Sequence, residues 1–163
     1  MKRILLLLIF AIALKSSIAQ QITLPPVSTL KTQADLDRTK ADLIRAADWL
    51  EKNRIDKQKE KRKVVERFVF MWISASKKFN VDMNQKILAL DEKNPGLIMI
   101  YTASATRYLV QNNRPSTTLE AQIAGLETIA SVYRKGNGIK KDKKMEALLL
   151  AQQKGRVKEW ILE

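Results

Sequence analysis

The 163-residue sequence predicts an all-α protein, folded as a single compact bundle or a short solenoid-like array of about six to seven helices. Apolar residues recur three and four positions apart through most of the chain, which is the spacing of a helix with one buried face. No stretch alternates apolar and polar residues as a half-buried strand does. Five glycines and four prolines leave few positions for the turns of a many-stranded β fold.

Residues 1–19 have the three parts of a secretory signal peptide. Met1-Lys2-Arg3 is positively charged, residues 4–14 are an unbroken apolar run, and small residues lead up to Ala19. We therefore expect cleavage between Ala19 and Gln20, which would make the protein periplasmic or secreted. The run of eleven apolar residues is too short to span a bilayer, which takes roughly 20. No other segment is longer, so we expect no transmembrane span after cleavage.

The rest of the chain divides into an extended leader at 20–31, which contains Pro25-Pro26, and a single helical domain at 32–163. The apolar spacing predicts helices at about 32–53, 56–79, 82–92, 96–112, 117–136, 142–155 and 157–161. Residues 68–73 are apolar on every side, which places the second of these helices at the centre of the bundle.

Several large side chains are expected in the core because they lie on apolar helix faces. These are Trp49, Trp72, Tyr133 and Trp160. Residues 102–105 are small and would let a neighbouring helix approach closely.

Polar side chains at the predicted helix starts are candidate N-caps, because their oxygens accept a backbone N–H. The candidates are Asp56, Asp82, Asn94, Thr117 and Asp142. Pro95 follows Asn94 at the first helical position, where its missing N–H costs nothing. Gly136 stands where a left-handed C-cap belongs.

Residues 124–155 combine a tyrosine-ended helix, a Gly-x-Gly turn and a second predicted helix. The defining residues are Tyr133, Gly136, Gly138, Ile139, Asp142 and Gly155. The segment resembles one unit of the sel-one-like repeat, a relative of the tetratricopeptide repeat. Such repeats bind proteins or peptides, so the resemblance implies an adaptor. No second copy follows at a fixed period, and a generic hairpin with a glycine C-cap and an aspartate N-cap would have the same letters.

The positive charge is concentrated in two short segments. The chain has 30 lysines and arginines against 17 acidic residues, and loss of the signal peptide would remove three positive charges. Residues 57–63 have five positive charges and one negative, and residues 134–144 have six positive and one negative. The candidate residues for an anionic partner are Lys57, Lys59, Lys61, Arg62, Lys63, Arg134, Lys135, Lys140, Lys141, Lys143 and Lys144.

Two basic patches on an otherwise nearly neutral domain can meet anionic lipid headgroups, a cell-wall polymer or nucleic acid. Solvated helix ends have the same composition, so ordinary surface is the alternative interpretation. We do not expect a nucleic-acid partner, because single-strand sites interleave aromatic rings with basic residues and neither segment contains Trp or Phe.

The missing residue types exclude many catalytic sites. Without His or Cys the chain has no imidazole base, thiolate nucleophile, disulfide or zinc–thiolate site. No calcium-loop pattern or dinucleotide-binding glycine motif is present, so we expect no metal site and no cofactor. Ser74 and Lys77 have the S-x-x-K spacing of penicillin-recognising enzymes, but the accompanying S-D-N and K-T-G motifs are missing. We therefore predict no catalytic residue.

These observations favour a non-enzymatic exported domain with a protein-binding or scaffold role in the cell envelope. Its partner would be an unknown protein or peptide. One alternative is a small, lysozyme-like envelope hydrolase based on carboxylates, for which Glu66 beside the apolar run is the candidate. The other is a module that associates with anionic membrane or cell-wall polymer through the two basic segments.

Overall fold

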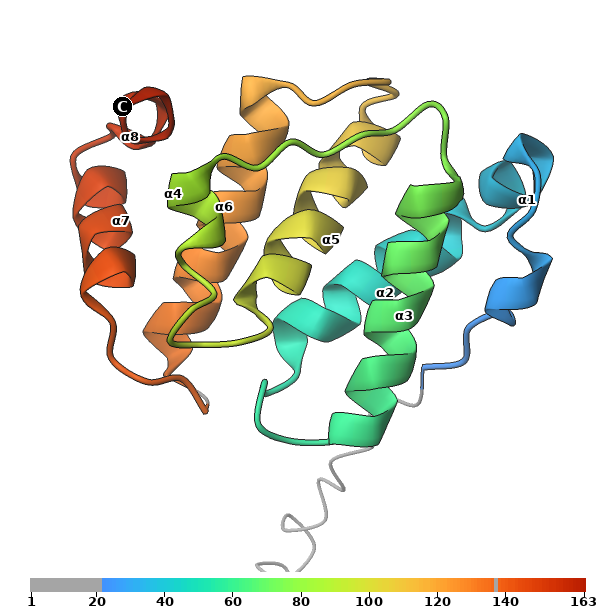
Figure 1. Cartoon of the computed structure of the whole chain (residues 1–163), viewed down its shortest axis with the longest axis horizontal. Helices are drawn as coiled ribbons and strands as arrows, with labels where there is room; N and C mark the ends of the chain where they lie inside the picture. The colour runs from blue at the N-terminus through green and yellow to red at the C-terminus, as the bar shows by residue number, and fades with distance from the viewer. Residues whose placement is uncertain (1–21, 137) are drawn as a thin grey trace, which may run out of the picture.

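The structure is a computed structural model that describes residues 22–136 and 138–163, and the predicted signal peptide lies outside these residues. The prediction of an all-α fold is confirmed, since the described residues form helices and no strand (Figure 1). The described elements are a 3-10 turn η2 (Val27–Thr29), α1 (Gln33–Arg38), α2 (Lys40–Lys52), α3 (Lys59–Ala75), α4 (Gln85–Leu88), α5 (Leu97–Gln111), α6 (Leu119–Lys135), α7 (Lys143–Gln153) and α8 (Val157–Leu162).

The hairpin of α5 and α6 occupies the centre of the fold, and these two helices pack together most extensively (Figure 1). Ala103 and Ala105, from the run of small residues in α5, are fully buried. Gly125 of α6 lies against Tyr101 of α5, so a Cβ at Gly125 would stand 2.6 Å from Tyr101 Cδ2 and 3.0 Å from its carbonyl oxygen. The Tyr101 hydroxyl donates to the Asp82 carbonyl oxygen at 3.1 Å, which holds the ring in this position. The close approach of the two helices therefore depends on a glycine at position 125.

The helix α2 lies behind α3 and α5 and buries Leu43 and Leu50 completely (Figure 1). Its edge is connected to α5 by Arg107, whose guanidinium pairs with Asp48 and, at 3.0 Å, with Glu51. A planar guanidinium can contact two carboxylates at once, so this one side chain links α5 to two positions of α2.

The prediction that residues 68–73 lie at the centre of the bundle is wrong. Phe68, Val69 and Trp72 are buried, but Phe70 is 60% exposed and Met71 is 36% exposed. The central position belongs to α5, whose small side chains allow helices to pack around it. The helix α3 lies on the outside and needs only one apolar face for burial.

The helix predicted at 32–53 is interrupted at Thr39, which separates α1 from α2. The Thr39 hydroxyl donates to the Asp35 carbonyl oxygen at 2.9 Å and accepts the indole N–H of Trp72 at 3.0 Å. A threonine hydroxyl that bonds to helix carbonyls competes with the backbone ladder. The interruption thus accompanies a contact with a residue 33 positions further along the chain, which no local period contains.

The helix predicted at 56–79 is shorter at both ends than expected. It begins at Lys59, after Gln58 in a left-handed conformation with φ of +50°, and it ends at Ala75. Beyond that end, the Ser76 hydroxyl accepts the Phe79 backbone N–H at 2.8 Å, which turns the chain away from the helix axis. Phe79 is still buried, as its position on the predicted apolar face required.

Two predicted caps are confirmed, and both depend on neighbours in the sequence. Gly136 ends α6 in the left-handed conformation, with φ of +66°. Asp142 begins α7, and its carboxylate accepts the Lys144 backbone N–H at 2.9 Å.

The other four predicted N-caps are wrong. The residues at the N-cap positions are Gln58, Asn84, Gly96 and Thr118, in place of Asp56, Asp82, Asn94 and Thr117. The predicted side chains have other partners. Asn94 binds the backbone of Lys140, and the Thr117 hydroxyl accepts the Asp82 N–H at 2.8 Å while donating to the Asn80 carbonyl oxygen.

The core prediction for the large aromatic residues is confirmed: Trp49, Trp72 and Trp160 are buried, and so is Tyr133. The leader, in its described part, lies along the same core. Ile22, Leu24 and Val27 pack against it, and one 3-10 turn replaces part of the predicted extended run.

The segment compared with the sel-one-like repeat forms α6, a turn and α7 (Figure 1). Its kinship with that repeat stays a prediction.

Candidate functional site

Three loops that are far apart in the sequence gather at one end of the molecule, along the lower edge of Figure 1. They are the connections before α3, before α5 and before α7. Gly138 of the third loop lies so close to Asp56 of the first that a Cβ at Gly138 would overlap the Asp56 side chain. Gly138 therefore lets the α6–α7 turn settle directly against the loop that leads into α3.

Asn94 joins the second loop to the third. Its amide nitrogen donates to the Lys140 carbonyl oxygen at 2.9 Å, and its side-chain oxygen accepts the Lys140 N–H at 2.7 Å. Asn94 is 5% exposed, so both hydrogen bonds are shielded from water. Close by, Lys144 pairs with Glu92 at 2.5 Å. These contacts hold the Lys140 segment in a fixed position relative to the rest of the fold.

The structure thus brings the two predicted basic segments to the same end, which we call the basic end. Its exposed members are Lys57, Lys59, Lys63, Arg134, Lys135, Lys140, Lys141, Lys143 and Lys144. The charge count along the sequence, which identified the two basic segments, did not include Lys93, an exposed lysine in the loop before α5. Lys93 stands alone between Glu92 and Asn94, so it does not form a run of positive charge in the sequence.

Lys61 and Arg62 differ from the other candidates because neither is fully exposed. Lys61 is partly buried, with its Nζ 5.7 Å from the centre of the Trp49 ring. Arg62 is 5% exposed and donates to the carbonyl oxygens of Leu50 at 3.3 Å and Asn53 at 2.8 Å. Arg62 therefore satisfies carbonyl groups at the end of α2, and the expectation that it contacts an anionic partner is corrected.

The carboxylate of Glu66 lies 3.5 Å from the Arg62 guanidinium, and the Glu66 side chain is 24% exposed. Burial raises the pKa of Glu66, and the charge of Arg62 opposes that shift. Burial also lowers the pKa of Arg62, with Glu66 acting in the opposite direction. Arg62 and Glu66 are one turn apart on α3, so the pair has the spacing of an ordinary ion pair along a helix.

The acidic groups near the basic end are already engaged. Asp56 pairs with Arg54 at 2.8 Å, and Glu60 pairs with Lys63 at 3.0 Å. Asp142 is buried as the cap of α7. The exposed lysines and arginines of this end outnumber these carboxylates and Glu92, so positive charge dominates the potential there, although Lys63 and Lys144 are themselves paired.

A polar groove of about 310 Å³ lies between α2, α5 and α6. It is lined by Glu51, Ser104, Arg107, Tyr108, Gln111, Ala124, Glu127, Thr128 and Ser131. The Ser104 hydroxyl is buried without a hydrogen-bond partner, and the Glu127 carboxylate forms no hydrogen bond or ion pair with any described residue. This groove was not predicted from the sequence; the overlooked signal is that the lining positions on α5 and on α6 recur three, four and seven residues apart.

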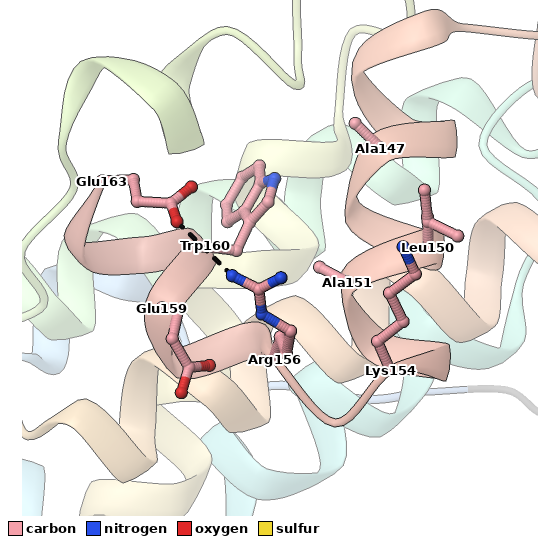
Figure 2. Close-up of a pocket in the computed structure, with 8 residues that line it drawn as sticks. All are labelled: Ala147, Leu150, Ala151, Lys154, Arg156, Glu159, Trp160 and Glu163. Carbon is pink, nitrogen blue, oxygen red and sulfur yellow. Dashed lines mark ion pairs between the residues drawn. The ribbon is translucent and has the colours of Figure 1, made fainter.

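Figure 2 shows a smaller hollow of about 180 Å³ between α7 and α8. Lys154, Arg156, Glu159 and Glu163 surround it, and Arg156 pairs with Glu163 at 3.9 Å. Trp160 forms part of its wall. Two positive and two negative charges balance around this hollow, so it presents no surface of a single charge to a ligand.

The structure bears on three further expectations about chemistry and location. The helix α3 ends between Ser74 and Lys77, so these residues do not share the helical turn that S-x-x-K catalysis needs. Within residues 22–136 and 138–163, no group of three or more acidic side chains is arranged to hold a metal ion. In the same ranges, no helix has the length and apolar character to cross a membrane.

Both basic segments were predicted from the sequence, but their meeting was not, because Gly138 and Asn94 act on residues far from themselves in the chain.

Comparison of the chain with family models, with curated proteins and with solved structures gives no significant match.

Proposed function

We propose that this protein is a non-enzymatic binding protein of the cell envelope and that its basic end docks on an anionic macromolecule. The observation that carries the proposal is the meeting of two basic segments at one end, through Gly138 against Asp56 and Asn94 against Lys140. Positive charge spread evenly over the surface would not require contacts that bring two distant basic segments together. A loop held by the shielded Asn94 hydrogen bonds also presents Lys140 and Lys141 with little loss of backbone entropy on binding.

The expected strength follows from the number of exposed positive charges. A lysine or arginine close to an anionic surface contributes about 1 kcal/mol. If only three of the exposed lysines engage at once, they contribute about 3 kcal/mol, which is more than a hundredfold in affinity. Exposed charges are screened over about 10 Å at 0.1 M salt, so binding should weaken steeply as salt rises.

The test compares two pairs of lysines that carry the same charge. Replacing Lys140 and Lys141 with glutamine should lower affinity for immobilised heparin about 30-fold, from about 2 kcal/mol of lost attraction. Replacing Lys154 and Lys158, which are exposed just after the end of α7 and in α8, should change it less than twofold. Equal losses of affinity from both pairs would show that only the overall charge matters, which would contradict docking through the basic end. Affinity that does not change with salt concentration would overturn the proposal.

The non-enzymatic part of the proposal is supported by the residue types available. The chain has no His or Cys, and Glu66, the candidate for a carboxylate hydrolase, is paired with buried Arg62. Purified protein should therefore leave peptidoglycan fragments and peptides unchanged. Hydrolysis that disappears in a Glu66→Gln variant would refute this part.

A second candidate function is capture of a protein partner through the polar groove between α2, α5 and α6. The groove contains the carboxylates of Glu51 and Glu127 against one arginine, Arg107, which is already paired. The buried Ser104 hydroxyl lacks a partner, and leaving such a group unsatisfied costs about 1–3 kcal/mol. A lysine side chain from a partner would complement both features.

Fluorescence anisotropy with a labelled lysine-rich peptide tests the groove. Glu127→Gln should weaken binding about tenfold if the carboxylate pairs with a lysine in a partly desolvated site. Glu120→Gln is the matched control, since Glu120 is exposed on the same helix but does not line the groove. Equal effects of the two changes would reject this candidate.

A further inference from the structure

The outward side of α3 combines exposed apolar and basic side chains. We call it the α3 outer face, and its members are Lys63, Val64, Arg67, Phe70 and Met71. They form two adjoining rows at spacings of three and four, so they share one side of the helix. Val64 is 63% exposed and Phe70 is 60% exposed, which are large values for apolar side chains in a chain with a well-filled core.

The other side of α3 accounts for its packing within the described fold. Val65, Phe68, Val69 and Trp72 are buried there, towards α2 and the centre of the fold. Figure 1 shows α3 at the front with α2 behind it. More than half of the surface of Val64 and of Phe70 therefore lies outside the packing of the described fold.

The apolar surface continues from Val64 into a cleft of about 270 Å³ between α3 and the leader. Its lining is mainly apolar and includes Leu24 and Pro25 of the leader, and its two basic residues are Lys61 and Arg67. Arg67 forms no ion pair with any residue in the described part of the chain. An apolar cleft beside an available guanidinium complements a molecule with an anionic headgroup and an apolar tail.

We propose that the α3 outer face rests on an anionic lipid bilayer, with Phe70, Met71 and Val64 entering the headgroup region. This inference rests on the proposed function, because Lys57 and Lys59 of the basic end directly precede this face and extend its charge. Lys63 and Arg67 would lie at the level of the lipid phosphates. A soluble polyanion would meet the same basic residues but offers no apolar phase, so the exposed Phe70 and Met71 favour lipid.

The first experiment separates lipid from polymer. Sedimentation with phosphatidylglycerol vesicles measures one interaction, and retention on heparin measures the other. Replacing Phe70 and Met71 with serine should reduce vesicle binding at least tenfold and leave heparin retention within twofold. The control replaces Leu150 and Leu162, which are 51% and 69% exposed on α7 and α8, and should leave both values unchanged.

The outcomes distinguish the two proposals. Heparin retention without vesicle binding by the unaltered protein would overturn the lipid inference and leave the proposed function standing. Vesicle binding that the Phe70 and Met71 changes do not reduce would also overturn it. If the unaltered protein binds neither heparin nor vesicles, the proposed function is refuted as well.

A second measurement reports insertion even if the serine variant folds poorly. The chain has no cysteine, so Phe70→Cys gives a single attachment point for an environment-sensitive fluorophore. Its emission should rise severalfold and shift to shorter wavelength on phosphatidylglycerol vesicles. The same label at Leu162→Cys should not respond. Equal responses at the two positions, or none at position 70, would refute insertion of the α3 outer face.

Discussion

Replacing Gly125 with alanine should destabilise the fold by about 2 kcal/mol, although alanine is the better helix former. The added Cβ would stand 2.6 and 2.8 Å from two ring carbons of Tyr101 and 3.0 Å from its carbonyl oxygen. Tyr101 is fully buried, and the contact with its backbone cannot be relieved by turning the ring. Overpacking of this kind costs up to about 3 kcal/mol, while the helix propensity of alanine returns about 1 kcal/mol.

Urea denaturation followed by circular dichroism measures this loss, and the midpoint should fall without a change in slope. The matched control is Gly136→Ala. At that position φ is +66° but nothing lies within 4 Å of an added Cβ, so only the conformational cost of about 1–2 kcal/mol applies. In a Tyr101→Leu background the two ring contacts are gone, so the cost of the alanine should fall to the part that comes from the carbonyl oxygen. An alanine variant as stable as the unaltered protein would refute the close-packing argument.

Three further predictions follow from contacts of single side chains. Asn94→Ala should lower the free energy of unfolding by about 2 kcal/mol, because two shielded hydrogen bonds are lost. Hydrogen exchange at the Lys140 amide should accelerate, and unchanged exchange would contradict the role of that contact. Thr39→Val leaves a buried indole N–H without its acceptor and should cost about 1–3 kcal/mol in a thermal melt; no loss would contradict the contact. Burial raises the pKa of Glu66 above 4.5, so the folded state keeps that proton to higher pH than the unfolded state does. The free energy of unfolding should therefore fall as pH rises past about 4.5, more steeply in Arg62→Met, and Glu66→Gln should remove this contribution in a pH series of urea titrations.

The sequence predicted features whose causes are local. Gly136 and Asp142 form caps with partners one turn away, so spacing alone was enough to find them. Asn94 has the same capping chemistry, but its partner is 46 residues distant. A side chain of this kind binds whichever backbone the fold brings to it, and the local pattern does not contain that information.

The candidate site shows the same division. Charge counting located both basic segments, because charge is a property of composition. It also included Arg62, whose burial depends on how α3 lies against the end of α2. The exposed position of Phe70 was missed for the opposite reason, since an apolar residue in an apolar run was assumed to be covered.

The packing of α5 against α6 also has a consequence for the order in which the fold forms. Residues 112–118 connect these two helices, so their contacts close only a short loop of chain and cost little entropy. We expect this hairpin to be the folding nucleus, with α7, α8 and the leader joining after the transition state. Gly125→Ala should then act mainly by slowing folding, with a φ-value well above one half. A φ-value near zero, with faster unfolding instead, would show that the two helices meet late.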